Sequence, residues 1–280
     1  MRILSIQSRV AFGYAGNSAA VFPLQRLGHE VVAVDTVHFA HHTGHGPARG
    51  PLHTPAEVTE VLDGLEAVGV LGGVDAVLTG YVGDPASGAV VLDAVARVRA
   101  ASPHATWTCD PVMGDYGRGM FVRTGIPEWF RDEVVPHTDV LTPNHYELGF
   151  LAGRPVDTLA QVRDAVDVLR ERGPRTVLVT SVLHDALPAG TVATLVVADE
   201  GAWVVSTPLL DVTTAGTGDL TAALFTAHLP AGPEAALVRT VASVHAVLAA
   251  TQPGAKEIAL LAAQDAIASP PDGLLAERLR

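Results

Sequence analysis

The stretch Gly216-Thr217-Gly218-Asp219-Leu220-Thr221-Ala222-Ala223-Leu224-Phe225 joins a glycine-containing turn to an apolar helical sequence. Its two glycines allow the backbone to approach a phosphate closely, and the following helix would aim free N–H groups and its positive dipole end at that phosphate. Asp219 could then take a proton from an attacking hydroxyl. The pattern Gly-x-Gly-Asp, here residues 216–219, also occurs by chance in loops. The helix dipole alone favours Asp in a first helical turn. If the rest of the chain agrees, the stretch favours phosphoryl transfer from a nucleotide to a small alcohol.

The segments before this turn alternate between short β-branched runs and longer helical patterns. The expected strands are residues 3–7, 30–35, 76–79, 106–109, 140–141 and 176–180. The expected helices between them are residues 17–27, 54–71, 85–101, 126–134 and 158–172. This alternation predicts βαβ units on a mostly parallel sheet.

The pattern changes in the last third of the chain. Two apolar runs, residues 191–197 and 202–206, flank Asp199-Glu200-Gly201, which predicts a hairpin and an antiparallel end to the sheet. Further helices are expected over residues 218–228, 233–252 and 258–267. We find no internal repeat, low-complexity tract or linker, so we predict one domain over residues 1–280.

The composition allows a large buried core, with 48% apolar and 17% charged residues. There are 18 Lys and Arg against 30 Asp and Glu, and the formal net charge of −12 argues against nucleic-acid or anionic-membrane partners. The one cysteine, Cys109, cannot form an internal disulfide, which fits a reducing cytoplasm. Because no run of 18 apolar residues is present, we expect a soluble cytoplasmic protein.

Polar residues follow the expected strands at their carboxyl ends, where ligands bind in open α/β sheets. They are Gln7-Ser8, residues 79–83, residues 110–114, residues 142–144 with Glu147 one turn on, and Thr180-Ser181. Asp110 is well placed to hold Mg²⁺, directly or through water, beside a nucleotide phosphate. This convergence strengthens the phosphate-site interpretation of the glycine turn.

Several of these residues also have a purely structural interpretation. Asn144 and Glu147 match a capping box, which would account for both without a ligand. Asp110 fits an ordinary turn before proline, and Ser8 could satisfy local backbone groups. Cys109 is expected to be a small buried apolar residue, because no histidine lies near it in the sequence.

Five histidines cluster in and beside one glycine-rich segment, at His38, His41, His42, His45 and His53. Their spacing resembles that of metal ligands. The segment is a loop and not a helix face, however, and it contains no acidic residue. We therefore predict a mobile loop over the active site, without a tightly bound structural metal.

Taken in order, these motifs resemble those of the pyridoxal kinases of the ribokinase-like superfamily, over nearly the whole chain. The motifs are residues 7–18, 36–44, 79–83, 109–114, 142–148, 180–181 and 216–220. Each is weak alone, but the ordered set is specific. The resemblance implies a ribokinase-like, three-layer α/β/α fold with a mostly parallel central sheet and an antiparallel edge.

The resemblance also implies an ATP-dependent kinase, usually a homodimer, that phosphorylates the 5′-hydroxyl of pyridoxal. Ser8 would hydrogen-bond the ring nitrogen. Thr43 and Gly44 would cover the ring, and Tyr81 would pack beside it. Asp219 would be the catalytic base, with Gly216, Thr217 and Gly218 as the anion hole. The residues implied for ATP and Mg²⁺ are Asp110, Thr142, Glu147, Thr180, Ser181, Val212, Thr213, Thr214 and Ala215, with Asp110 and Glu147 at the metal, in part through water. A monovalent-cation requirement stays open.

The chain departs from several relatives, which carry lysine where this chain has Thr180. Metal and backbone N–H groups must then meet the phosphate charge, and Arg118 is either an additional cation there or a solvated loop residue.

The nearest alternative function is that of a hydroxymethylpyrimidine kinase of the same superfamily, and a second is that of a non-catalytic vitamer-binding protein. A dinucleotide oxidoreductase is excluded, because Gly13 and Gly16 do not form Gly-x-Gly-x-x-Gly after the first strand.

Overall fold

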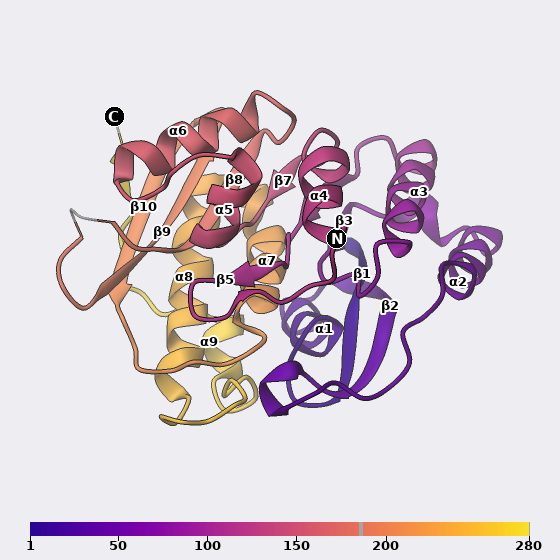
Figure 1. The fold of residues 1–280 in the computed structure, drawn as a ribbon, viewed down its shortest axis with the longest axis horizontal. Helices are drawn as coiled ribbons and strands as arrows, with labels where there is room; N and C mark the ends of the chain where they lie inside the picture. Colours follow the sequence, from indigo (N-terminus) through magenta and orange to yellow (C-terminus); the bar gives the residue numbers. More distant parts are fainter. Residues whose placement is uncertain (185–186, 280) are drawn as a thin grey trace.

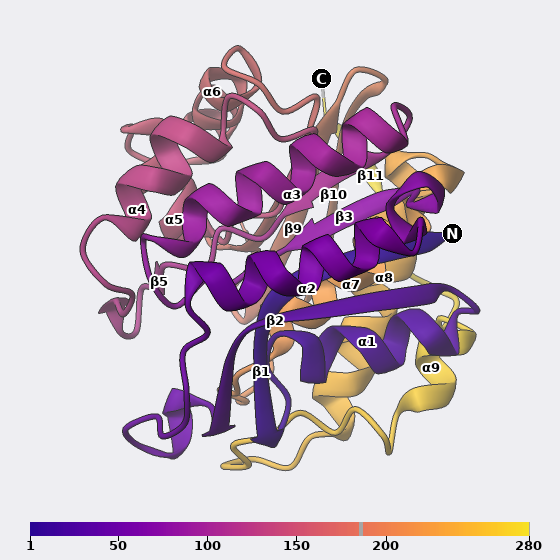
Figure 2. The same ribbon diagram turned by 90° about the vertical axis from the view of Figure 1, so that its right-hand side faces the viewer.

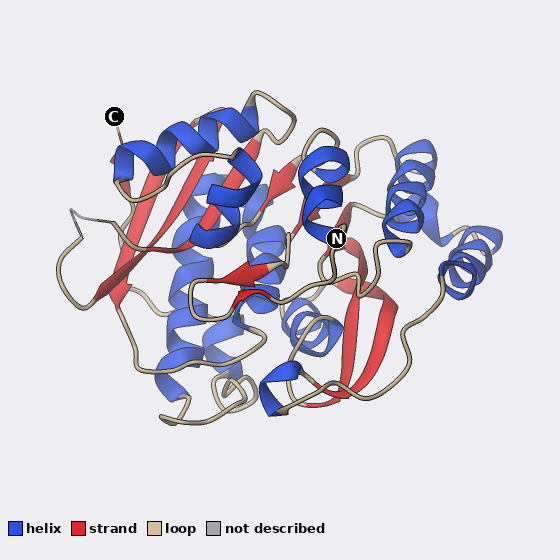
Figure 3. Cartoon of the chain, in the orientation of Figure 1, coloured by secondary structure: helices blue, strands red, loops and turns tan. Residues whose placement is uncertain are grey.

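The computed structural model describes residues 1–184 and 187–279 and places nine strands in one sheet (Figures 1 and 3). In spatial order these are β11 (Glu277–Leu279), β10 (Gly201–Pro208), β9 (Thr191–Ala198), β8 (Thr176–Val182), β7 (Val140–Leu141), β4 (Thr106–Cys109), β3 (Ala76–Thr79), β1 (Arg2–Phe12) and β2 (Glu30–His41). Neighbours from β2 to β8 are parallel. The pairs from β8 to β11 are antiparallel, so the predicted mixed sheet is confirmed.

Helices cover both faces of the sheet, which makes three layers (Figure 2). One layer contains α1 (Asn17–Arg26), α7 (Thr217–His228), α8 (Pro233–Ala250) and α9 (Gln264–Ala268). The other contains α2 (Pro55–Ala67), α3 (Ser87–Ala101), α4 (Ile126–Trp129), α5 (His145–Ala152) and α6 (Leu159–Arg170). The three-layer α/β/α arrangement expected from the sequence is confirmed. Among the described residues, no helix has the length and apolar character needed to cross a membrane.

The core explains why the central strands are continuous apolar runs, since helices bury both of their faces. On one face Trp107 and Phe130 belong to the larger core cluster, each 1% exposed. On the other face Leu78 packs with Ala222 and Ala223 of α7. Small alanines at these positions let α7 lie close to the sheet, which fixes the start of this helix near the carboxyl ends of the strands.

Helix starts with strong sequence signals form where expected. Thr54 Oγ1 accepts the Glu57 N–H, and the Glu57 carboxylate accepts the Thr54 N–H. Thr158 and Gln161 form the same capping box before α6. Each box satisfies N–H groups that the first helical turn would otherwise leave without partners.

The sequence underestimated β1 and β2, which stay paired as far as Phe12 and His41. It also missed a small hairpin of β5 (Gly114–Asp115) and β6 (Gly119–Met120), whose two-residue strands are too short to show alternation. The extended ends of β1 and β2 and the separate β5–β6 hairpin both contribute walls to the cavity described below.

The helix predicted over residues 258–267 is largely wrong, because only α9 forms there. Ile258 and Leu260 are both buried, at alternate positions of a non-helical segment. Thr251 Oγ1 accepts the Ala259 N–H at 2.9 Å, so a side chain takes the place of a helical carbonyl. The buried apolar residues of this segment are two positions apart, as in an extended chain, and not three or four apart as in a helix.

Candidate active site

A cavity of about 470 Å³, a volume typical of small-molecule sites, opens beyond the carboxyl ends of the parallel strands. Every site residue expected from the sequence except Gly44 lines it, namely Ser8, Thr43, Tyr81, Asp110, Thr142, Glu147, Thr180, Ser181 and residues 212–219. They come from strand ends far apart in the sequence. The parallel topology collects them, because the strands that carry them end at the same edge of the sheet.

Backbone packing holds the glycine turn at the start of α7. Gly216 has a φ of 84°, and a Cβ there would overlap the Tyr14 carbonyl oxygen. A Cβ built on Gly218 would lie 3.4 Å from Asp110 Oδ2, so the turn and this carboxyl group are neighbours. Among the described residues no side chain caps α7, which leaves its first N–H groups available at the cavity wall. This arrangement is suited to an anion.

Three carboxyl groups meet in the cavity. Burial raises the pKa of Asp110 well above its usual range, and the charges of Glu147 and Asp219 raise it further. Burial raises the pKa of Glu147 to about 7, against the opposing effect of the backbone N–H groups that it accepts. Burial also raises the pKa of Asp219, while backbone N–H groups and His42 act in the opposite direction. Because ionised carboxylates this close repel one another, a cation would stabilise the group.

Glu147 is both part of a helix cap and part of the cavity wall. Its Oε2 accepts the Asn144 N–H at 2.9 Å and Asn144 Oδ1 accepts the Glu147 N–H at 2.9 Å, so the capping interpretation is confirmed. Its Oε1 accepts the Met113 N–H at 2.8 Å. Oε1 also accepts the Gly114 N–H at 3.4 Å, so three donors occupy most of the roughly four acceptor sites of this 3% exposed carboxylate. A water-mediated contact to a metal therefore suits Glu147 better than direct ligation.

Ser8 lies where the register of β1 on β2 shifts. Gly16 packs so closely against Ser8 that a Cβ at Gly16 would overlap its carbonyl and hydroxyl oxygens. Ser18 Oγ donates to the Val10 carbonyl at 2.8 Å and ties α1 to the same strand. The Gly-Asn-Ser motif therefore fixes the strand that carries Ser8. Tyr81 lines the same cavity and is half-buried, which raises the pKa of its hydroxyl.

Ser181 and Arg118 are distinctive members of the wall. Ser181 has a φ of 54°, rare for a residue other than glycine, at an irregularity in the pairing of β8 with β9. Arg118, on the β5–β6 hairpin, is the sole lysine or arginine among the described residues that line the cavity. Its guanidinium pairs with Asp115 Oδ2 at 2.7 Å. Thr180 adds no charge, so the cavity holds more carboxyl groups than cationic ones.

The histidine loop, residues 41–46, meets a carboxylate that the sequence analysis did not expect. His42 Nε2 and His45 Nε2 lie 2.7 and 2.6 Å from Glu257 Oε1. The loop itself contains no acid, but the fold brings Glu257 to it across more than 200 residues, so the argument from lacking carboxylates is wrong. The three side chains could together hold a metal ion. The expectation that no tightly bound metal is present stays a prediction.

Sequence reasoning missed the apolar end of the cavity. It is lined by Val192 and Thr194 of β9, Thr207 and Pro208 of β10, the following Leu209 and Leu210, and Thr240, Val241, Val244, His245 and Leu248 of α8. The last four stand at positions i, i+3, i+4 and i+7 of α8, which is one face of a helix. That spacing was visible in the sequence, but it does not distinguish a cavity wall from a core face.

Known proteins resemble this chain over its whole length. A family model described as phosphomethylpyrimidine kinase matches residues 51–257. Pyridoxal kinase PdxY of Leifsonia xyli is 52% identical over 282 residues and covers 100% of both chains. That of Rubrobacter xylanophilus is 54% identical over 275 residues, covering 97% of this chain and 95% of its own. The structure of pyridoxal kinase from Leishmania donovani in complex with ADP and pyridoxamine has a TM-score of 0.92 and 30% identity, covering 100% of this chain and 99% of that one.

Proposed function

The chain belongs to the pyridoxal kinase family, and we propose that it transfers the γ-phosphate of ATP to the 5′-hydroxyl of pyridoxal, which gives pyridoxal 5′-phosphate. The observation that carries this proposal is the position of Asp219. This carboxyl group stands in the first turn of α7, beside uncapped N–H groups and close to Asp110. A base, an anion site and a candidate metal ligand thus share one cavity.

Asp219 acts as the general base in this proposal. A primary alcohol is a poor nucleophile until its proton is leaving, and a carboxylate can accept that proton as the phosphoryl group arrives. Its raised pKa makes it a stronger proton acceptor than an exposed aspartate. The N–H groups from Gly216 to Gly218 face the charge that develops on the transferred phosphoryl oxygens.

Asp110 and Glu147 are the residues that would hold Mg²⁺, Asp110 directly and Glu147 through water. Carboxylate and water oxygens are the ligands that Mg²⁺ prefers. Burial raises the pKa of both residues, and the charge of Glu147 raises that of Asp110 further, as the charge of Asp115 does for Glu147. When bound, Mg²⁺ would neutralise negative charge on the phosphates of the nucleotide. This contribution is important because Arg118 is the sole lysine or arginine among the described residues that line the cavity, and it already pairs with Asp115.

The two ends of the cavity suit the two substrates. Ser8, Thr43 and Tyr81 form the wall for the pyridine ring, and Gly44 follows Thr43 in the adjoining turn without lining the cavity itself. The remaining ATP contacts are Thr142, Thr180, Ser181 and residues 212–215 with Thr217, and the apolar surface on α8 and β10 accommodates the adenine base. Thr43 is exposed, so the ring side of the site remains accessible from solvent.

A coupled assay for ADP release tests the proposal, with pyridoxal, pyridoxine, pyridoxamine and hydroxymethylpyrimidine as acceptors. We expect pyridoxal to have a higher kcat/KM than hydroxymethylpyrimidine. The matching family model is described by a phosphorylated pyrimidine, so the pyrimidine kinase is the second candidate. A higher kcat/KM for hydroxymethylpyrimidine would replace pyridoxal as the substrate, and no turnover with any acceptor would favour a binding protein.

We further propose that the enzyme is a cytoplasmic homodimer. The buried free thiol of Cys109 is compatible with a reducing compartment. Phe12, at the projecting end of β1, is 62% exposed and offers an apolar surface to a second copy. Light scattering coupled to size-exclusion chromatography measures the mass directly, and a mass equal to one chain would overturn the dimer.

A further inference from the structure

We propose that Glu257 is a positioning residue for the pyridoxal end of the site, which it holds in shape through His42, His45 and Tyr14. The identity of the substrate in this inference rests on the proposed function. Glu257 lies between α8 and α9, whereas the histidine loop follows β2. Figure 1 shows the short purple turn of the histidine loop beside the yellow C-terminal segment.

The Glu257 carboxylate joins three separate parts of the chain. Its Oε1 accepts hydrogen bonds from His42 Nε2 at 2.7 Å and His45 Nε2 at 2.6 Å. Its Oε2 accepts the Tyr14 N–H at 2.7 Å. A Cβ on Gly13 would overlap this carboxylate, so the glycine leaves the space that Glu257 occupies. The side chain is 21% exposed, which shields these hydrogen bonds from much of the solvent.

His42 transmits the position of Glu257 to the residues that are expected to cover the ring. It precedes the 3₁₀ turn Thr43–His45, and its Nδ1 accepts the Gly44 N–H at 3.1 Å. Because Nδ1 accepts, the proton of the neutral ring is on Nε2, which donates to Glu257. His42 is 6% exposed and lines the same cavity as Asp219, the proposed catalytic base.

A metal ion is the competing occupant of this cluster. The candidate ligand atoms of His42, His45 and Glu257 all lie within 4.8 Å of one another. A metal at His42 Nε2 would need that atom without its proton, and the proton would then move to Nδ1, which faces the Gly44 N–H. Hydrogen bonds to Glu257 avoid this conflict of two donors. The geometry therefore favours a Glu257 carboxylate that accepts hydrogen bonds from the histidines over one that binds a metal ion with them.

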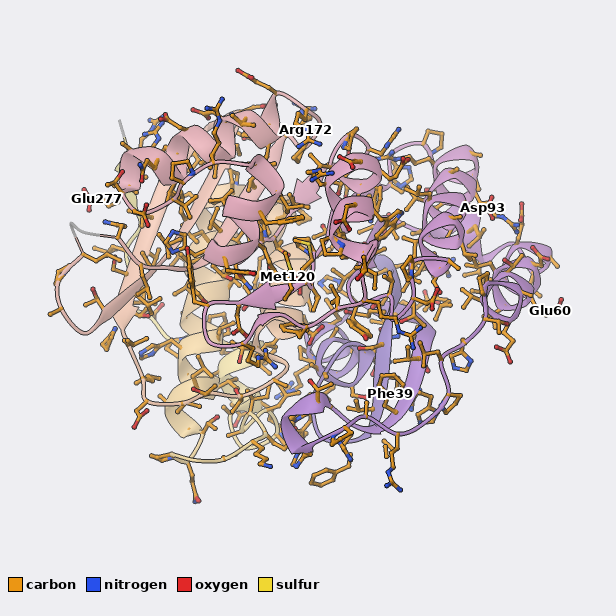
Figure 4. The ribbon with its side chains drawn as sticks, viewed as in Figure 1. Phe39, Glu60, Asp93, Met120, Arg172 and Glu277 are labelled. Atoms are coloured by element: carbon orange, nitrogen blue, oxygen red, sulfur yellow. The ribbon has the colours of Figure 1, made fainter. Side chains whose placement is uncertain are left out.

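Substitution of Glu257 separates a positioning role from a purely structural one. Glu257→Ala should raise the KM for pyridoxal about tenfold, which corresponds to about 1.4 kcal/mol, because the hydrogen bonds that hold the turn are lost. The KM for ATP should change little. Glu257→Gln should be intermediate, because its single carbonyl oxygen can serve the histidines or Tyr14 but not both. Glu60→Ala is the control, since Glu60 is exposed on α2, at a distance from Phe39 of the cavity wall (Figure 4).

His42 offers a second, finer test. In His42→Asn the amide oxygen can replace Nδ1 as acceptor for the Gly44 N–H while the contact to Glu257 is lost. In His42→Gln the amide nitrogen can replace Nε2 and keep the contact to Glu257. We expect His42→Asn to resemble Glu257→Ala, and His42→Gln to retain a lower KM for pyridoxal. A lower KM for pyridoxal in His42→Asn than in His42→Gln would contradict the proposal that Glu257 positions the turn through His42.

Hydrogen exchange tests the same inference without turnover. Amides of residues 41–46 should exchange faster in Glu257→Ala than in wild type, with α2 and α3 unchanged. If wild type fails to phosphorylate pyridoxal but this difference is seen, the proposed substrate is wrong and the role of Glu257 stands. An unchanged KM for pyridoxal, an equal rise in both KM values, or one zinc ion per chain by elemental analysis of tag-free protein would each overturn the proposal.

Discussion

The glycine turn before α7 and the histidine loop after β2 line one cavity, yet they are built in different ways. The turn takes its glycines and its carboxylate from four consecutive residues, Gly216 to Asp219. The histidine loop is held by Glu257, which lies 215 residues after His42. Sequence spacing fixes the geometry of the first region, whereas tertiary packing assembles the second. Local motifs can therefore be recognised before the fold is known, and assembled clusters cannot.

The largest effect is expected at the local motif. Asp219→Asn keeps the shape of the side chain but cannot accept a proton, so kcat should fall by about 10²–10⁴. ATP should still bind, because the N–H groups of the turn remain and one negative charge is removed. The measurement is kcat, the KM for pyridoxal and the melting temperature on one preparation.

A merely structural Asp219 predicts a different pattern. If its role were only to complement the helix dipole, the substitution would cost about 0.5–2 kcal/mol of stability and leave kcat near normal. A folded Asp219→Asn protein with kcat within about threefold of wild type, against the loss expected for a base, would end the general-base assignment. The glycine turn would then bind phosphate without supplying the catalytic base.

The carboxyl cluster gives a pH-dependent effect on stability. The pKa of Glu147 is raised from 4.5 to about 7 on folding, so the folded protein binds more protons than the unfolded one between these values. The free energy of unfolding should therefore fall as pH rises through this window, by up to about 3 kcal/mol from Glu147 alone. Urea unfolding of metal-free protein at pH 5 and pH 8 measures it.

Glu147→Gln is the matched control for this effect, because glutamine preserves the capping box and does not ionise. Its stability should change less between pH 5 and pH 8 than that of wild type. Equal slopes in the two proteins would mean that other groups dominate the pH dependence. Mg²⁺ with nucleotide should also reduce the wild-type slope, since it would offset the repulsion among the carboxylates.

The glycine turn should be sensitive to a single methyl group. In Gly216→Ala the residue must adopt a positive φ, at a cost of about 1–3 kcal/mol, and its Cβ would also overlap the Tyr14 carbonyl oxygen. We expect kcat/KM to fall roughly tenfold or more, as the first N–H groups of α7 are displaced. Gly28→Ala has nearly the same φ, 83°, but no neighbour within 4 Å of the new Cβ. Equal losses of activity in both would show that contact with Tyr14 is irrelevant.

The features that could be predicted from the sequence are the ones set by local motifs, and those that could not are assembled by tertiary packing. The short central strands, the capping boxes at Thr54 and Thr158 and the convergence of strand ends all depend on local patterns, and the structure reproduces them. The β5–β6 hairpin, the contact of Glu257 with His42 and the non-helical run after Thr251 depend on packing between distant segments. No pattern within one segment of the sequence determines such contacts.

The apolar end of the cavity depends both on a local helix pattern and on packing between distant segments, and substitutions there should have the smallest effect. Leu248 shares a helix face with other wall residues, and it is half-buried. Leu248→Ala removes apolar surface from the proposed adenine contact, so the KM for ATP should rise about five- to tenfold, with the KM for pyridoxal unchanged. Leu275→Ala is the control, since Leu275 is 86% exposed and does not line this cavity. If the KM for pyridoxal rose instead, the two ends of the cavity would be assigned to the wrong substrates, and the histidine loop would have to be considered as part of the nucleotide site.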